Sequence, residues 1–178
     1  MPQHESMTML EQEITVGGLS GLELLARLES SGIQLNEIAR QILTDENFKA
    51  CPQPSRIKVA FKSLSELGLP NGGFLSEAID AAGALGYRLC PLDLGPHLRL
   101  AYRNQDEGSI GFEAIKHQAP PRSITVVDQC PDKDQSEYRG LYLRRIDGRL
   151  WLRGYKSWSG HVWQPNDMLA FTVAHNAA

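Results

Sequence analysis

Arginine and aromatic side chains alternate with aliphatic ones in two short runs, residues 142–146 and 149–153, and this pattern could bind an anion. The first run carries Tyr142 and Arg144, and the second carries Arg149, Trp151 and Arg153. The planar guanidinium group of arginine bonds carboxylate or phosphate in a bidentate manner and also stacks on aromatic rings. These residue types at this spacing therefore predict a surface that recognises an anionic partner.

A second run of the same kind follows Gly95-Pro96. His97, Arg99 and Arg103 alternate there with apolar residues, which predicts a strand at residues 98–103 with one cationic side. If both sets of strands belong to one sheet, their cationic sides form one concave surface. Alternatively, these side chains face solvent, and the arginine–tryptophan pairs are ordinary cross-strand contacts worth under about 1 kcal/mol each. The sequence supports the two interpretations equally.

Nucleophilic catalysis has one candidate pair, Cys90 and His97, the only thiol and imidazole that lie close together in the sequence. A nucleophile and its base need hydrogen-bond reach, and Pro91 and Gly95-Pro96 could turn the chain enough to provide it. The chain lacks a GxxxxGK(S/T) phosphate loop, a GxGxxG after a strand, an HExxH and a GxSxG. Histidines 97, 117 and 161 are scattered, so neither a metal site nor a cofactor is predicted.

A second aromatic group follows the two runs and consists of Tyr155, Trp158, His161 and Trp163. Such side chains could stack on bases or sugars. Two tryptophans after a hairpin more often seal the end of a small β core. We therefore favour the structural interpretation for this group.

The element that would position the arginines is a β-hairpin, and its clearest signal is the Asp147-Gly148 dipeptide. Two alternating runs joined by Asp-Gly indicate a hairpin, because a two-residue type I′ turn needs positive φ at both central positions. Pairing then runs outward from the turn and separates an aliphatic face from an arginine and aromatic face. The predicted opposite residues are Ile146 and Arg149, Arg144 and Trp151, Tyr142 and Arg153, Leu143 and Leu152, and Arg145 and Leu150.

The front half of the chain is predicted to be mainly helical. Ser20 and Glu23 form a capping box, and Ser63 and Glu66 form a second one over a single turn. Apolar residues at helical spacing and glycine stops predict helices at about 22–31, 35–43 and 75–85. Alternating apolar residues predict a strand at 57–61.

The back half is predicted to consist mainly of strands, at residues 87–92, 98–103, 123–127, the hairpin, and 168–173. This segregation favours an α+β fold, with a helix-rich N-terminal half packed against a mainly antiparallel C-terminal sheet or small barrel. We expect one domain over residues 13–175, helical at about 19–86 and strand-rich at about 87–175. Residues 1–12 are expected to be disordered.

The composition indicates which classes of partner and which cellular compartment are expected. The 178 residues carry a net charge of −3, which provides no general attraction to nucleic acid or to an anionic membrane. No apolar stretch approaches the ~18 residues of a membrane span, and the first ten residues do not resemble a secretory signal. The three cysteines are widely spaced, which favours reduced thiols, and each is followed by proline. We expect a cytoplasmic protein.

Three stretches resemble an uncharacterised family of small bacterial proteins that often carry the label "helicase". They are Leu89–Leu100, Ala119–Thr125 and Tyr142–Tyr155, and the similarity extends over about residues 33–171. A helicase needs a phosphate-binding loop and much more chain for its two motor lobes, and this sequence has neither. The resemblance therefore implies no catalytic residue and no helicase activity.

The leading hypothesis is a non-enzymatic binding protein that masks or regulates a partner protein, as an antitoxin or immunity protein does. Residues 139–156 carry six bases and one acid, whereas residues 1–50 carry eight acids and three bases. The alternative is a nucleic-acid or nucleotide binder that uses the same arginine and aromatic side chains. The third hypothesis is a small hydrolase or transferase built on Cys90 and His97.

Overall fold

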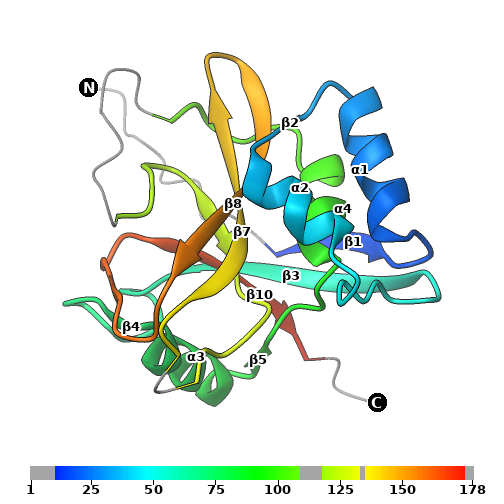
Figure 1. Cartoon of the computed structure of the whole chain (residues 1–178). Coiled ribbons are helices and arrows are strands. Elements are labelled where there is room, and N and C mark those ends of the chain that lie inside the picture. Colours follow the sequence, from blue (N-terminus) through cyan, green and yellow to red (C-terminus); the bar gives the residue numbers. More distant parts are fainter. Residues whose placement is uncertain (1–10, 109–117, 133–134, 175–178) are drawn as a thin grey trace, which may run out of the picture.

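The computed structural model describes residues 11–108, 118–132 and 135–174, and helices and strands interleave through them in an α+β fold (Figure 1). The predicted fold class is confirmed at this level. The elements are β1 (Gln12–Val16), α1 (Gly21–Ser30), β2 (Gln34–Leu35), α2 (Glu37–Thr44), β3 (Ser55–Ser63), β4 (Gly73–Phe74), α3 (Leu75–Ala84), β5 (Tyr87–Arg88), α4 (Leu94–Ala101), β6 (Ile124–Val126), β7 (Tyr138–Ile146), β8 (Arg149–Ser157), β9 (Val162–Trp163) and β10 (Met168–Val173).

One mixed sheet of eight strands forms the centre of the described structure. Its order is β1-β3-β10-β6-β7-β8-β2, with β5 beside β10, while β4 and β9 form a separate two-stranded sheet. β10 runs parallel to β6 and β2 runs parallel to β8. The expected separation of a helix-rich front half from a strand-rich back half is wrong, because β1 and β3 belong to the same sheet as the later strands. The small barrel is also wrong, since this sheet is open, with β1 and β2 at its edges.

Helices cover both faces of the sheet. α1, α2 and α4 pack together on one face, and α3 lies at the other end of the molecule near β4 and β5 (Figure 1). In β10, Ala170 belongs to the buried cluster beneath α1, α2 and α4, whereas Leu169 and Phe171 belong to the cluster beneath α3. Successive residues of a strand point to opposite faces. The two clusters are therefore the cores on the two sides of the sheet.

Helix α4 replaces the strand expected at residues 98–103, and that prediction is wrong. Leu94 and Leu98, one helical turn apart, are fully buried. Pro96 lies in the first turn of the helix, where no backbone N–H is required. Alternation over only six residues fits one side of a short helix as well as it fits a strand.

Local signals predicted the structure correctly at other points of the chain. At both predicted capping boxes the serine hydroxyl accepts the N–H of a glutamate three residues later, and that glutamate accepts the serine N–H. Asp147 and Gly148 have φ of 49° and 72°, and all five predicted pairs of the hairpin are confirmed. The strand expected at 87–92 is reduced to β5. Beyond it the Cys90 N–H donates to the Val127 carbonyl at 2.8 Å, and Pro91, which has no N–H, ends the pairing.

Asn36 joins α2 to the outer edge of β8. Its side-chain Oδ1 accepts the N–H of Ala39, which caps the helix, and also the N–H of Gly154 at 2.7 Å. Its Nδ2 donates to the Gly154 carbonyl at 2.8 Å. A side chain at Gly154 would not fit, because a Cβ there would lie 2.6 Å from the Ala39 nitrogen and from Ile38. The asparagine amide thus pairs with β8 as a neighbouring strand would.

The expected disorder of residues 1–12 falls largely outside the described residues, although Gln12 begins β1. Within the ranges given above, none of the helices has the length and apolar character needed to cross a membrane.

Candidate functional site

The β7–β8 hairpin presents the predicted arginine and aromatic side chains on one side. We call Tyr142, Arg144, Arg149, Trp151 and Arg153 the arginine–aromatic face. The opposite side of the hairpin carries leucines 143 and 152, which are fully buried in the core beneath α1, α2 and α4. This burial fixes the direction of the face, because a strand with one side in the core must turn its other side away from it.

Arg153 is held in place by two neighbours on the face. Its Nε donates to the Tyr142 hydroxyl at 3.0 Å, and its guanidinium carbon lies 5.0 Å from the centre of the Trp151 ring. Tyr142 is the residue directly opposite in the β7–β8 register. The terminal N–H groups of Arg153 make no hydrogen bond to any residue that the structure describes, so they remain available to an anion.

Arg144, Arg149 and Arg153 have no carboxylate partner among the described residues. Arg144 lies opposite Trp151 and diagonal to both other arginines, so all three arginines are neighbours of Trp151 in the register. Arg149 is exposed, and the other two are half-buried. Grouped like charges without a counter-ion raise the free energy of the isolated protein and favour binding of an anion.

The remaining members of the expected cationic surface lie elsewhere. Arg99 is fully buried in α4, where its guanidinium donates to the Gln105 side chain and to the Tyr102 carbonyl. Burial lowers the pKa of Arg99 to about 10, which leaves it charged at neutral pH. Arg103 follows the helix and donates to the Leu100 carbonyl. The structure therefore brings five of the eight predicted side chains together and leaves out Arg99, Arg103 and His97.

Cys90 and His97 have separate partners. The Cys90 thiol is buried and donates to the Ala170 carbonyl at 3.3 Å, and burial raises its pKa strongly. His97 Nε2 accepts the Gly17 N–H at 3.0 Å and lies 3.8 Å from the Asp93 carboxylate, and burial lowers the pKa of this imidazole. No hydrogen bond joins thiol to imidazole within the described chain, and a thiol with a raised pKa supplies little of the reactive thiolate.

The aromatic group after the hairpin continues from the face into the interior. The rings follow one another from Tyr142 to Tyr155 at 6.1 Å, to Trp163 at 6.0 Å, to His161 at 5.1 Å and to Trp158 at 5.5 Å. Trp163 is only 4% exposed and belongs to the core beneath α3, whereas Trp158 is 40% exposed. Trp158 is therefore the most exposed ring of this series, while His161 and Trp163 are closed to a ligand from solvent.

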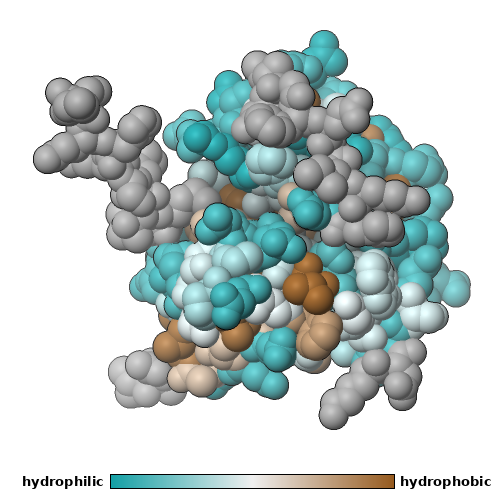
Figure 2. Space-filling model, turned by 90° about the vertical axis from the view of Figure 1, so that its left-hand side faces the viewer, coloured by the Kyte–Doolittle hydropathy of each residue, from teal (hydrophilic) through white to brown (hydrophobic). Residues whose placement is uncertain are grey.

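Exposed apolar residues also lie on the β4–β9 pair, which contains Trp163. Phe74 and Val162 are opposite each other in the β4–β9 pair, and both are more than 40% exposed. Figure 2 shows hydrophobic side chains gathered over the lower part of the face on which β4 and β9 lie. Apolar exposure of this kind is typical of protein–protein contact sites when it is contiguous.

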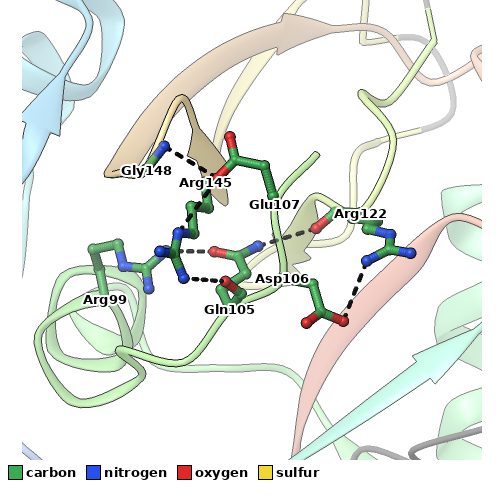
Figure 3. A network of polar contacts seen from close by, with 7 residues as sticks. All are labelled: Arg99, Gln105, Asp106, Glu107, Arg122, Arg145 and Gly148. Atoms are coloured by element: carbon green, nitrogen blue, oxygen red, sulfur yellow. Dashed lines mark hydrogen bonds and ion pairs between the residues drawn. The ribbon is translucent and has the colours of Figure 1, made fainter. Parts of the chain in front are cut away.

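A buried polar network centred on Gln105 was not predicted from the sequence (Figure 3). Gln105 is 2% exposed, and its amide nitrogen donates to the carbonyls of Arg122 and Leu143, both at 3.0 Å. Its amide oxygen accepts from Arg99. An isolated glutamine in a polar stretch gives no signal of such a role, because two of its partners, Arg122 and Leu143, come from distant segments.

The same segment is tied to the hairpin turn. Arg145 donates to the Gln105 carbonyl at 3.3 Å and lies 3.4 Å from the Glu107 carboxylate, which also accepts the Gly148 N–H at 3.1 Å (Figure 3). These contacts hold the turn between β7 and β8. They also give Arg145, on the aliphatic side, a counter-ion, whereas the arginines of the arginine–aromatic face have none among the described residues.

No cluster of three or more histidine, cysteine or acidic side chains is arranged to hold a metal ion in the parts that the structure describes. His117 lies outside them. No protein-family model matches the sequence, and searches of curated proteins and of solved structures also find no match. The side chains described above therefore have to indicate the function by themselves.

Proposed function

We propose that this chain is a non-enzymatic, cytosolic protein-binding module that masks or regulates an acidic partner protein, as an antitoxin or immunity protein does. The observation that carries the proposal is the arginine–aromatic face. Arg153 is held between Trp151 and Tyr142, and Trp151 is also flanked by two further arginines, which lack carboxylate partners in the described structure.

Two physical reasons support a protein partner. Tryptophan, tyrosine and arginine are the residues that most often dominate the free energy of protein–protein binding. The contacts of Arg153 restrict its side chain before binding, so less conformational entropy is lost when a carboxylate is bound. Acidic side chains on the partner would supply the missing counter-ions of Arg144, Arg149 and Arg153.

Phosphate groups could satisfy the same guanidinium groups, so nucleic acid is the competing ligand. The net charge of −3 gives the chain no overall attraction to a polyanion. The exposed apolar residues Phe74, Val162 and Trp158 at the end of the aromatic series also suit a protein interface, which combines an apolar part with a polar rim.

Affinity isolation from the native host tests this proposal. The tagged protein would be compared, with and without nuclease, with Arg144→Ala/Arg153→Ala. Arg139→Ala/Lys156→Ala is the matched control, because these residues face each other on the opposite side of the same hairpin and the variant removes the same charge. A protein retained after nuclease treatment, lost in the face variant and kept in the control would support the proposal.

Binding of the recovered partner would then be measured with purified proteins. We expect the face variant to lose about 2 kcal/mol or more of binding free energy, the range of interface hot spots. Retention that disappears with nuclease would assign the face to nucleic acid, and equal loss in both variants would assign it to unspecific attraction. Either result, or the absence of any retained protein, would overturn the proposal.

A further inference from the structure

A pocket of about 520 Å³ lies between the end of α4, the loop before β6 and the start of β10. Tyr102, Pro120, Ile124 and Met168 contribute apolar walls. Ile124 and Met168 are adjacent in the parallel register of β6 and β10, so the sheet itself forms the floor. Ligand sites in proteins have volumes of about 300–1,000 Å³ and are mostly apolar with a few polar groups. Both the size and the lining of this pocket fall within that description.

The charges around the pocket leave one carboxylate uncompensated. Its charged residues are Asp106, Arg122 and Asp167. Arg122 pairs with Asp106 at 3.4 Å, and this exposed pair forms part of the pocket wall (Figure 3). Asp167 has no cationic partner in the described chain. Its Oδ2 accepts the Gln164 N–H at 2.8 Å, and its Oδ1 makes no hydrogen bond to a described residue.

Asp167 is half-buried, and its surroundings favour a cationic donor at the free oxygen. Burial raises the pKa of this carboxyl, because an apolar surrounding disfavours its charged form. A donor that carries a positive charge would restore the lost solvation of the carboxylate. The apolar walls, in contrast, favour a hydrocarbon body over a second polar group.

The wall formed by residues 120–123 is already in a fixed shape. Ser123 N–H donates to the Pro120 carbonyl at 3.1 Å and closes a β-turn, in which Arg122 has φ of +59°. A residue with a side chain seldom adopts this left-handed conformation, and such strain persists where other contacts impose it. Gln105 holds this turn by donating to the Arg122 carbonyl at 3.0 Å. This wall of the pocket is therefore fixed by contacts within the chain.

We propose that this pocket binds a small amine, a compound with one protonated amino group on an aromatic or branched apolar body. The body lies between Tyr102, Pro120 and Met168, and the ammonium group donates to Asp167 Oδ1. This site is separate in its residues from the arginine–aromatic face, so it adds a small cationic ligand to the proposed protein partner.

Three probes of similar size and different charge test the proposal by NMR titration of the full chain at pH 7. They are phenethylamine, 2-phenylethanol and 3-phenylpropanoate, followed at the methyl groups of Ile124 and Met168. We expect saturable binding of phenethylamine, about 10-fold tighter than that of the alcohol, and no binding of the carboxylate. Asp167→Asn keeps an acceptor for Gln164, and it should weaken only the amine, by about 10-fold.

Asp45→Asn is the matched control, because Asp45 lies in a different pocket, beside α2, and its loss removes the same charge. Phenethylamine should bind this control as it binds the wild type. The proposal is overturned by a carboxylate that binds as tightly as the amine, by unchanged amine binding in Asp167→Asn, or by equal weakening in Asp45→Asn. Absence of saturable amine binding up to about 10 mM also overturns it, since affinity weaker than that is under about 3 kcal/mol.

Discussion

Asn36→Asp should destabilise the protein although it exchanges one amino group for one oxygen. The orientation of the Asn36 amide is determined by its neighbours, because two N–H groups, of Ala39 and Gly154, converge on Oδ1 while Nδ2 meets the Gly154 carbonyl. An aspartate keeps the acceptor for both N–H groups. Its second oxygen, however, would lie 2.8 Å from the Gly154 carbonyl with no proton between them.

The expected cost follows from the lost hydrogen bond and from the unpaired carbonyl it leaves. Gly154 is buried, so its unpaired carbonyl costs about 1–3 kcal/mol in addition to the repulsion between the two oxygens. We expect Asn36→Asp to lose about 2–4 kcal/mol at pH 7. Asn36→Ala also removes the helix cap, worth about 1 kcal/mol, and leaves the Gly154 N–H unpaired, so it should lose about 3–5 kcal/mol.

The loss in Asn36→Asp should depend on pH. A protonated carboxyl can donate to the Gly154 carbonyl, so folding raises the pKa of the introduced carboxyl above its unfolded value near 3.9 in this variant. The folded state then binds more protons than the unfolded state, and stability falls as pH rises from about 4 to about 7. The difference from wild type should therefore be smaller at pH 4.5 than at pH 7.5.

Urea denaturation followed by circular dichroism measures both effects. Asn71→Asp is the control, because it makes the same chemical change at an exposed loop position before β4 and should stay within about 0.5 kcal/mol of wild type. The account of this junction would be refuted if Asn36→Asp matched the wild type at pH 7.5. It would also be refuted if the difference between the two proteins were the same at both pH values.

Three further outcomes are expected. Burial raises the pKa of Asp128 to about 7, above its unfolded value, so the stability of the wild type should fall by at most ~4 kcal/mol between about pH 4 and pH 7. Thermal melting over this pH range measures the fall, and an Asp128→Asn variant whose stability depends on pH as steeply as that of the wild type would contradict the prediction. Iodoacetamide should label exposed Cys130 and spare buried Cys90 under native conditions, and peptide mass spectrometry that finds equal labelling would argue against the burial. In urea denaturation, Leu143→Ala should lose about 2–5 kcal/mol of unfolding free energy, whereas Leu85→Ala, at an exposed position, should change it by under about 0.5 kcal/mol. Equal losses in the two variants would show that Leu143 is not a core residue.

The parts of the fold that could be predicted from the sequence are those determined by neighbours along the chain. The turn at Asp147-Gly148 sets the register of β7 and β8, and this register alone places Trp151 opposite Arg144. The serine and glutamate of a capping box are three residues apart. In contrast, no local pattern indicates that β10 pairs with β3, because that pairing depends on which surfaces remain free after the nearer elements have formed.

The candidate sites divide in the same way. The arginine–aromatic face lies on one hairpin, so alternation was sufficient to find it. Arg99 was assigned to a surface because alternation with apolar residues predicted a strand with one cationic side, yet it lies in a helix and donates to Gln105 in the interior. Gln105 and the Asp167 pocket are assembled from segments far apart in the sequence, and their residue types are common in ordinary loops.

The position of β10 has a consequence for synthesis of the protein in the cell. β10 is made after every strand it pairs with, and it lies between β3 and β6. At a synthesis rate of about 5–20 residues per second, roughly 5–20 s pass between the synthesis of β3 and that of β10, and one edge of β3 is unpaired during this time. A bare strand edge is a template for pairing with another chain. Production of this protein should therefore be sensitive to the crowding of nascent chains, and chaperones that shield strand edges should raise its soluble yield.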